Sequence, residues 1–245
     1  MKPEDRPRGS EPARGQSGRL LAFLDYDGTI TTHEVNEIVL QDLVGDAWRP
    51  FEDEVKAGRM GHAECFDTQI RLIRAPRQDL LGAMLAGAAP APALQEFLRA
   101  VDESGGRSVV VSAGFREVIQ AFWQREALPP ARIVASELVN DGADHAGPYH
   151  VAFNPALGDC PRCGKASCKA AVLRALRRPG DRVVVFGDGD SDVCPAREAD
   201  LTFARGRLAE VCAAEGLPWR PLDYAEALRL LPELTAPAPA CGARP

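Results

Sequence analysis

The stretch LAFLDYDGTITTHE, residues 21–34, determines how the rest of this chain has to fold. It begins as an apolar run and then places two carboxylates, Asp25 and Asp27, directly ahead of Gly28. Like charges held close together repel each other and raise each other's pKa, so a strand end with a purely structural role rarely carries two of them. The stretch therefore predicts a positive partner that stabilises the carboxylates, or a reaction that uses them.

Further apolar runs end in polar residues in the same way. The segments 107–114 (RSVVVSAG) and 182–189 (RVVVFGDG) are predicted strands, and 201–205 (LTFAR) is a shorter one. Continuous apolar runs without alternation are typical of parallel strands that are covered on both faces. Residues 115–128 and 169–178 carry apolar side chains at helical spacing. This alternation of strands and helices predicts an α/β fold with a Rossmann-like parallel sheet as its core.

The segment between the first two strands has a different character. Residues 33–103 consist of helical patterns and predict a helical cap inserted into the α/β core, which would comprise 19–32 and 104–233. The ends, 1–18 and 234–245, are rich in proline, glycine and arginine or alanine and are expected to be disordered tails. The apolar residues of the first cap helix, most of which are expected to pack against other helices, are Val35, Ile38, Val39 and Leu43.

The composition excludes several classes of protein. With 45% hydrophobic and 26% charged residues, the chain of 245 residues can bury a sizeable core. Its net charge of −6 disfavours binding to nucleic acid or to an anionic membrane. No apolar run approaches the roughly 20 residues that cross a bilayer, and the first residues lack the apolar core of a signal peptide. We therefore expect a cytoplasmic protein whose seven cysteines are reduced.

Four motifs, taken in order, resemble those of the haloacid dehalogenase superfamily of phosphotransferases. Residues 25–31 match its first motif, Asp-x-Asp-Gly-Thr-x-Thr, and Ser112 matches the hydroxyl residue that ends a later strand. Lys169, or alternatively Lys165, matches the lysine that opens a later helix. Residues 187–192 match the fourth motif, Gly-Asp-x-x-x-Asp. Each motif alone is weak, but four in order on the predicted elements are specific.

The resemblance implies hydrolysis of a phosphomonoester with the help of Mg²⁺. Asp25 would attack phosphorus and form an aspartyl-phosphate, and Asp27 would serve as general acid and then as general base. Ser112, the backbone N–H of Gly114 and the ammonium of Lys169 would bind the transferring phosphoryl group. The metal ion and the lysine together would offset the negative charge of the paired carboxylates. The residues expected to hold Mg²⁺ are Asp25, Asp27 (through its backbone carbonyl), Asp188 and Asp192.

The position of the cap resembles the branch of the superfamily that contains phosphoserine phosphatases and methionine-salvage phosphatases. Glu34 stands where the former bind a substrate ammonium, but it also completes a possible capping box with Thr31. Arg71 is a candidate for binding a substrate carboxylate, although it is out of register. The residues expected to face the leaving group are Glu34, His62, Phe66 and Arg71.

The predicted substrate is a small phosphorylated metabolite. The segments around Cys168-Lys169 and 201–208 resemble the methionine-salvage phosphatases, which favours 2-hydroxy-3-keto-5-methylthiopentenyl 1-phosphate over phosphoserine. A phosphotransferase that passes the phosphoryl group to an alcohol is an alternative within the same chemistry. The alternative without catalysis is a zinc-binding regulatory protein on the same scaffold. The sequence leaves the oligomeric state open.

Three cysteines lie close together in the sequence. Cys160, Cys163 and Cys168 could hold Zn²⁺, which takes four tetrahedral ligands in structural sites. A cluster of reduced thiols in a loop, or an occasional disulfide, is the alternative. The candidates for a fourth ligand are His145, His150 and Cys194.

Overall fold

The fold is taken from a computed structural model of the chain. The described residues are 19–140, 146–157, 160 and 168–236. The tail expected at 1–18 lies outside them, and so does most of the tail expected at 234–245. Residues 234 and 235 instead belong to the last helix, α10 (Tyr224–Thr235). No helix formed by the described residues has the length and apolar character that crossing a bilayer requires.

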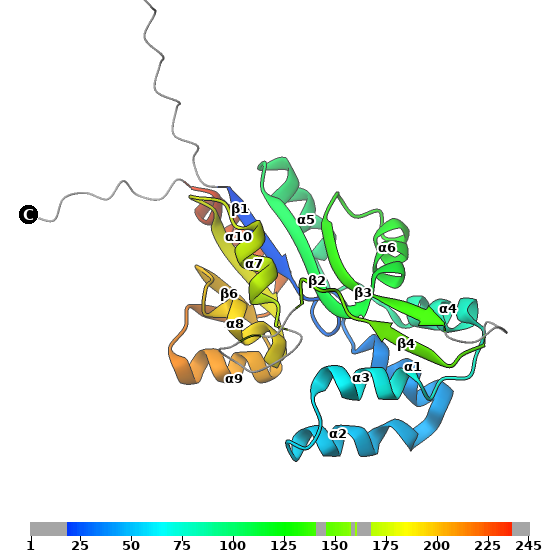
Figure 1. Cartoon of the computed structure of the whole chain (residues 1–245). Helices are drawn as coiled ribbons and strands as arrows, with labels where there is room; N and C mark the ends of the chain where they lie inside the picture. The colour runs from blue at the N-terminus through cyan, green and yellow to red at the C-terminus, as the bar shows by residue number, and fades with distance from the viewer. Residues whose placement is uncertain (1–18, 141–145, 158–159, 161–167, 237–245) are drawn as a thin grey trace, which may run out of the picture.

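A seven-stranded sheet forms the centre of the protein, in the order β4-β3-β2-β1-β5-β6-β7 (Figure 1). All neighbouring strands are parallel except β3 and β4, which are antiparallel. The predicted α/β class with a Rossmann-like parallel core is confirmed. The strands are β1 (Leu20–Leu24), β2 (Arg107–Phe115), β3 (Arg132–Asn140), β4 (Tyr149–Ala152), β5 (Arg182–Gly187), β6 (Leu201–Ala204) and β7 (Trp219–Pro221).

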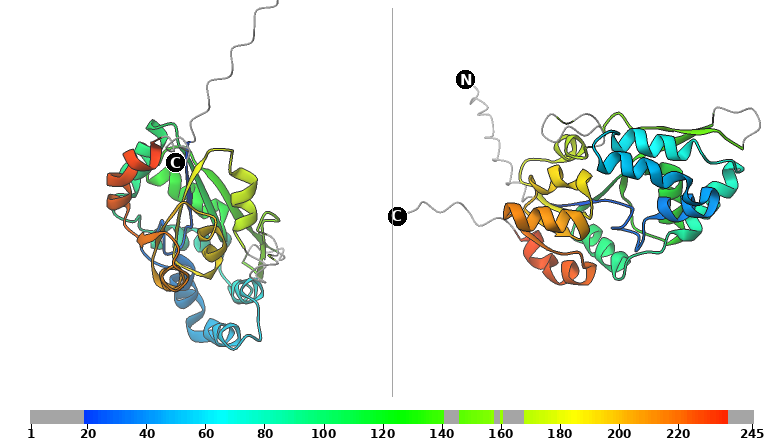
Figure 2. Two further views of the ribbon diagram at one scale, coloured as in Figure 1. Left: turned by 90° about the vertical axis from the view of Figure 1, so that its left-hand side faces the viewer. Right: turned by 90° about the horizontal axis from the view of Figure 1, so that it is seen from below.

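Helices cover both faces of this sheet, with α7 on one side and α10 on the other (Figure 2). Alternate residues of β1 therefore face different helices: Leu20 and Leu24 share a core with α5, α6 and α10, whereas Phe23 packs in the core that includes α7. This two-sided burial explains why the strand is apolar throughout. The other helices of the sheet layers are α5 (Leu94–Glu103), α6 (Arg116–Arg125), α7 (Ala170–Leu176), α8 (Val193–Ala196), α9 (Gly206–Glu215) and the short η2 (Asp190–Asp192).

The cap lies over the carboxyl ends of the strands (Figure 1). Its helices are α1 (Val35–Val44), η1 (Gly45–Trp48), α2 (Arg49–Lys56), α3 (His62–Ile70) and α4 (Arg77–Gly87). Helix α3 also lies beside the edge strand β4, where the Val151 backbone N–H donates to Asp67 Oδ1 at 2.7 Å. The cap is thus tied to the edge of the sheet as well as joined to it through the chain.

The packing of helix α5 bears on where the cap ends. It falls within 33–103, the range predicted for the cap, but its contacts are with α10 and β2. The fully buried Phe97 of α5 packs against Phe186 of β5, with ring centroids 5.0 Å apart, and against Tyr224 of α10 at 5.6 Å. We therefore propose that the cap ends before α5 and that α5 belongs to the core.

The apolar face of α1 also differs from the prediction. Val35 and Val39 are buried, as expected, and Leu40 is buried with them. Ile38 and Leu43, however, are 36% and 40% exposed, the two large hydrophobic side chains that the described surface exposes most. The buried stripe is rotated toward Leu40 because α1 packs on α4 and η1.

Replacement of Phe97 tests the place of α5. Phe97→Ala should lower the free energy of unfolding by about 3–5 kcal/mol, because it leaves a cavity between α5, β5 and α10. Leu43→Ala is the control, since a half-exposed site should cost no more than about 0.5 kcal/mol. Chemical denaturation measures both. Equal, small losses in the two variants would mean that α5 does not pack in the core.

Candidate active site

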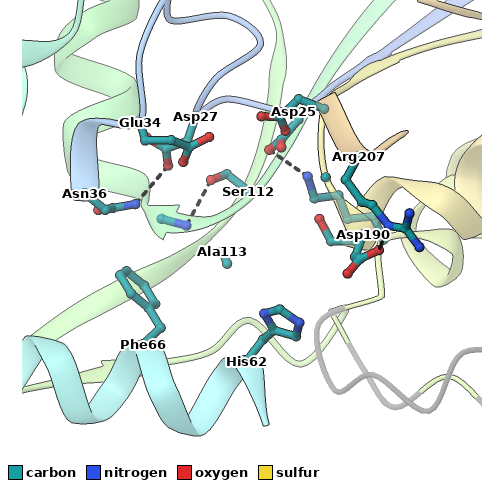
Figure 3. A pocket seen from close by; sticks show the side chains of 15 residues that line it. Asp25, Asp27, Glu34, Asn36, His62, Phe66, Ser112, Ala113, Asp190 and Arg207 are labelled. Carbon is teal, nitrogen blue, oxygen red and sulfur yellow. Dashed lines mark hydrogen bonds and ion pairs between the residues drawn. The ribbon is translucent and has the colours of Figure 1, made fainter. Parts of the chain in front are cut away.

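A cavity of about 340 Å³ lies between the cap and the carboxyl ends of β1, β2 and β5 (Figure 3). The central strand β1 is flanked by β2 on one side and β5 on the other, so the chain crosses the sheet in opposite directions from this point. Open α/β sheets bind their ligands at such a crevice. The lining residues are Asp25, Asp27, Glu34, Asn36, His62, Phe66, Ser112, Ala113, Gly114, Lys169, Asp188, Gly189, Asp190, Ser191 and Arg207.

Lys169 is the positive partner that the sequence requires. Its ammonium lies 2.6 Å from Asp25 Oδ1 and 2.8 Å from Asp192 Oδ1, and its side chain is 3% exposed. Burial alone would lower the pKa of Lys169, but Asp192 and Asp25 raise the pKa above its ordinary value. The ammonium therefore stays charged. Lys165, the alternative for this role, lies outside the described residues.

Three carboxylates converge around this lysine. One oxygen atom of each of Asp25, Asp188 and Asp192 lies within 4.8 Å of the others. Burial raises the pKa of Asp25 above its ordinary value, although the charge of Lys169 opposes the shift. Burial, followed by the charge of Glu34, raises the pKa of Asp188. One ammonium cannot balance three carboxylates, and Mg²⁺ prefers oxygen ligands of this kind. The donor set fits Mg²⁺ at the place expected from the sequence.

Backbone groups orient Asp192 toward the cluster. Its Oδ2 accepts hydrogen bonds from the backbone N–H groups of Asp188 at 3.3 Å and Gly189 at 3.4 Å. At Gly187, a Cβ atom would lie 2.6 Å from the Asp192 carboxylate. Glycine is therefore required where the fourth motif leaves β5.

The Asp27 carboxylate is bound by the start of the cap helix α1. Its Oδ1 accepts from the Val35 backbone N–H at 3.1 Å, and its Oδ2 accepts from Asn36 Nδ2 at 2.9 Å. Burial, and next the charge of Asp25, raises the pKa of Asp27 to about 7. A carboxyl group that titrates near neutrality is suited to both proton donation and proton acceptance. Metal binding by the Asp27 backbone carbonyl stays a prediction.

Ser112 and Gly114 lie near the end of β2, beside Asp27. The Gly114 backbone N–H donates to Ser112 Oγ at 2.9 Å, and both residues line the cavity. A Cβ atom at Gly114 would lie 3.1 Å from Ser112 Oγ and 3.3 Å from Asp27 Oδ2. The glycine therefore keeps open the space between the hydroxyl and Asp27. Their binding of a phosphoryl group stays a prediction.

Glu34 belongs to the active site and forms no capping box. It stands at the N-cap of α1, but its side chain makes no capping hydrogen bond. Its carboxyl group instead hydrogen-bonds to Asp188, and burial, followed by the charge of Asp27, raises its pKa to about 7. The capping box with Thr31 is thus wrong, because Asp27 already binds the first backbone N–H of α1.

Gly28 makes room for this carboxyl pair. With φ at +64°, it adopts a conformation that favours glycine. A Cβ atom there would lie 2.4 Å from Asp188 Oδ2 and 2.5 Å from Glu34 Oε1. The glycine of the first motif is required for both reasons.

Arg71 is not part of the cavity. It follows the last turn of α3, and its Nε donates to Asp67 Oδ2 at 2.7 Å. Since Asp67 is itself fixed to β4, the arginine is held at the outer edge of the cap. His62 and Phe66, from the same helix, line the cavity, whereas Arg71 is not among its lining residues. A contact between Arg71 and the leaving group stays a prediction that this arrangement does not favour.

Sequence reasoning missed two residues of the site. Asn36 binds Asp27, which precedes it by nine positions, and no local pattern indicates this contact. Arg207 lies at the mouth with its side chain 60% exposed, and its Nε is 3.6 Å from Asp190 Oδ1 (Figure 3). Asp190 also lines the cavity. Arg207 lies in the segment 201–208, which carries part of the family resemblance.

The cysteines gather outside the cavity. Cys160, Cys168 and Cys194 place their sulfur atoms within 4.8 Å of one another. Cys163 and His145 lie outside the described residues, and the described His150 has no ligand atom in this group. Of the candidate fourth ligands, Cys194 is the one that the fold brings to the cluster.

The fold and this arrangement of groups agree with comparisons against known proteins. The model of the haloacid dehalogenase-like hydrolase family matches residues 22–197. The chain belongs to this family, and it is a hydrolase.

Among curated relatives, the 2-hydroxy-3-keto-5-methylthiopentenyl-1-phosphate phosphatase of Geobacillus kaustophilus is 26% identical over 83% of this chain and 90% of its own length. The bifunctional enzyme MtnB/MtnX of Bacillus licheniformis is 28% identical over 87% of this chain and 49% of its length. A solved phosphoserine phosphatase with bound substrate covers 87% of this chain and 99% of its own, with a TM-score of 0.62 and 16% identity. At that identity, the structural likeness shows the fold alone.

The raised pKa values predict how the stability of metal-free protein depends on pH. Asp27 and Glu34 have ordinary pKa values of 3.8 and 4.5 but titrate near 7 in the folded protein. Between these values the folded state binds more protons than the unfolded state, so stability falls as pH rises. With EDTA present, the free energy of unfolding should therefore decrease from about pH 4 to about pH 7.

Denaturation at pH 5 and pH 7.5 tests this expectation. Asp27→Asn, which removes one of the groups, should make the decrease smaller. Added Mg²⁺ should stabilise the protein more at the higher pH, because metal and protons compete for the carboxylates. A stability that rises with pH in EDTA, with the same slope in the variant, would contradict the prediction.

Proposed function

We propose that this protein is a Mg²⁺-dependent phosphatase that hydrolyses a small phosphomonoester through an aspartyl-phosphate on Asp25. The observation that carries the proposal is the ion pair between Asp25 and Lys169 at the end of the central strand, inside a cavity shared by core and cap. Phosphoryl transfer needs positioning and charge neutralisation above all. A carboxylate beside a buried ammonium supplies a nucleophile and a neutralising group in one place.

Each residue has a distinct part in this chemistry. Asp25 attacks phosphorus, and Lys169 remains close enough to neutralise the phosphoryl oxygens. Asp27, held by Asn36 and by the start of α1, donates a proton to the leaving oxygen and then accepts one from water. Asp25, Asp188 and Asp192 would hold Mg²⁺. When bound, the ion supplies further charge neutralisation to the phosphoryl group.

The cap favours a small substrate. Helix α3 places His62 and Phe66 opposite the carboxylates, so a leaving group bound between them is enclosed on two sides (Figure 3). A cavity of about 340 Å³ accommodates a metabolite. A cytoplasmic location, in keeping with such a substrate, is part of the proposal. Transfer to an alcohol in place of water uses the same residues and is distinguished by its product.

Substitution of the two motif aspartates tests the chemistry. Asp25→Asn should reduce hydrolysis of an aryl phosphate to background because the amide cannot attack phosphorus. Asp27→Asn should lower kcat by roughly 10²–10⁴-fold. Rapid quenching and mass spectrometry should detect phosphate on Asp25 in the wild type.

Asp53→Asn, at an exposed cap position, is the matched control and should retain wild-type activity. EDTA should abolish turnover and Mg²⁺ should restore it. Near-normal turnover by Asp25→Asn would exclude the covalent mechanism. Normal turnover in EDTA would exclude the dependence on Mg²⁺. A protein with all motif residues but no turnover would support the zinc-binding regulatory alternative.

The substrate side of the cavity favours an enol or keto phosphate over phosphoserine. Among the described lining residues, the cap contributes Glu34, Asn36, His62 and Phe66 but no arginine to bind a carboxylate. Phe66 stacks on Phe115 with ring centroids 5.7 Å apart, which gives this wall an apolar surface. The methylthiopentenyl-phosphate phosphatases, which match over most of their length, support the same choice. We propose 2-hydroxy-3-keto-5-methylthiopentenyl 1-phosphate as the substrate.

A comparison of catalytic efficiencies tests this choice. The enol phosphate should be hydrolysed with a kcat/KM about tenfold or more above that for phosphoserine. Glu34→Gln should not reverse this order, and Glu37→Gln, at an exposed position on the same helix, is the control. A preference for phosphoserine that disappears in Glu34→Gln, but not in Glu37→Gln, would show that Glu34 binds a substrate ammonium.

A further inference from the structure

A second cluster of potential ligands lies behind the active site. The sulfur atoms of Cys160, Cys168 and Cys194 come from three places: the segment after β4, the residue before Lys169, and α8. The three residues are 7%, 2% and 1% exposed. Together with Ala170 they form a small buried group separate from the main cores. The catalytic chemistry proposed above uses none of these thiols.

The spacing of the sulfur atoms is informative. Cys160 Sγ and Cys194 Sγ are 4.0 Å apart, about twice the length of a disulfide bond. Two sulfur ligands at about 2.3 Å from one tetrahedral Zn²⁺ ion would lie about 3.8 Å apart. Since all three sulfur atoms fit within 4.8 Å of one another, a single ion can contact all of them with small adjustments.

Two arginines lie near the cluster. Arg174 interacts electrostatically with Cys160 and Cys168, and Arg197 with Cys194. Each guanidinium group is also paired with a carboxylate, Arg174 with Glu198 and Arg197 with Glu215, so the net charge of −1 on three thiolates around Zn²⁺ is only partly offset. Soft sulfur ligands select Zn²⁺ over Mg²⁺, so the two proposed metal sites would not compete for the same ion.

We propose that Cys160, Cys168 and Cys194 bind a structural Zn²⁺ ion. The site extends the zinc prediction made from the sequence, because Cys194 is distant in the chain and is brought in by the fold. A water molecule or a further side chain would complete the tetrahedral shell.

The position of this site gives the ion a structural role. Cys168 directly precedes Lys169, and Cys194 follows Asp192 by two residues. The ion would therefore join the backbone segments on both sides of the ion pair between Lys169 and Asp192, whose atoms are 2.8 Å apart. Zinc would hold the lysine and the carboxylate in register without touching a substrate.

Metal analysis of the full-length protein tests the site. Wild-type protein from zinc-supplemented medium, dialysed without strong chelator, should contain about one zinc ion per chain. Cys160→Ser and Cys194→Ser should each lose most of it. Cys212→Ser is the matched control, since Cys212 is equally buried but lies in α9, in another core cluster. This variant should retain the metal.

Cobalt provides a readout that does not depend on the variants folding or on enzymatic activity. Replacement of zinc by Co²⁺ in the wild type should produce a thiolate-to-cobalt charge-transfer band in the near ultraviolet. Removal of zinc should lower the melting temperature of the wild type and of Cys212→Ser. Less than about 0.1 zinc ion per chain in the wild type, absence of the cobalt band, or equal zinc in Cys194→Ser and Cys212→Ser would overturn the proposal.

Discussion

The ammonium of Lys169, placed between Asp25 and Asp192, is the interaction on which the rest of this structure depends. The three residues come from the end of β1, the start of α7 and the end of η2. The ammonium nitrogen lies 2.6 Å from Asp25 Oδ1 and 2.8 Å from Asp192 Oδ1. Two buried carboxylates without this ammonium would be costly to bury. The sheet order that places β5 beside β1 is therefore also what makes the carboxylate cluster possible.

The crowding of carboxylates around Lys169 also explains where glycines are required and how the cap is attached. Gly28, Gly114 and Gly187 each stand where a Cβ atom would approach a carboxylate of the site or its neighbours. Asp27 binds the start of α1 and does not bind Lys169. A single carboxylate thus couples the first cap helix to the core. Asp25 and Asp27 are two positions apart in the chain but have different partners, Lys169 for Asp25 and the start of α1 for Asp27.

The sequence predicted the groups that local pattern encodes. Apolar strands that end in Asp25, Ser112 and Asp188 indicated both the parallel sheet and the edge at which the site lies, because parallel strands end on one side. Arg71 and Asn36 could not be placed in this way. Their positions depend on how α3 and α1 turn in the cap, and a helix pattern does not fix that rotation. The placement of α5 depends likewise on the contact of Phe97 with Phe186, a tertiary contact without a local signal.

The attachment of α3 to β4 limits where molecules can enter and leave the cavity. The Val151 N–H binds Asp67, and Tyr149 Oη donates to the Ala75 carbonyl at 2.6 Å, so the edge strand and this side of the cap form one unit. Swinging α3 away from the strand would break both hydrogen bonds. If the proposed phosphatase reaction holds, we expect the substrate to enter and phosphate to leave at the opposite rim, between His62 and the exposed side chain of Arg207 (Figure 3). The exposed guanidinium at that rim, paired with Asp190 and Glu210, would meet an incoming anion before the buried Lys169 does.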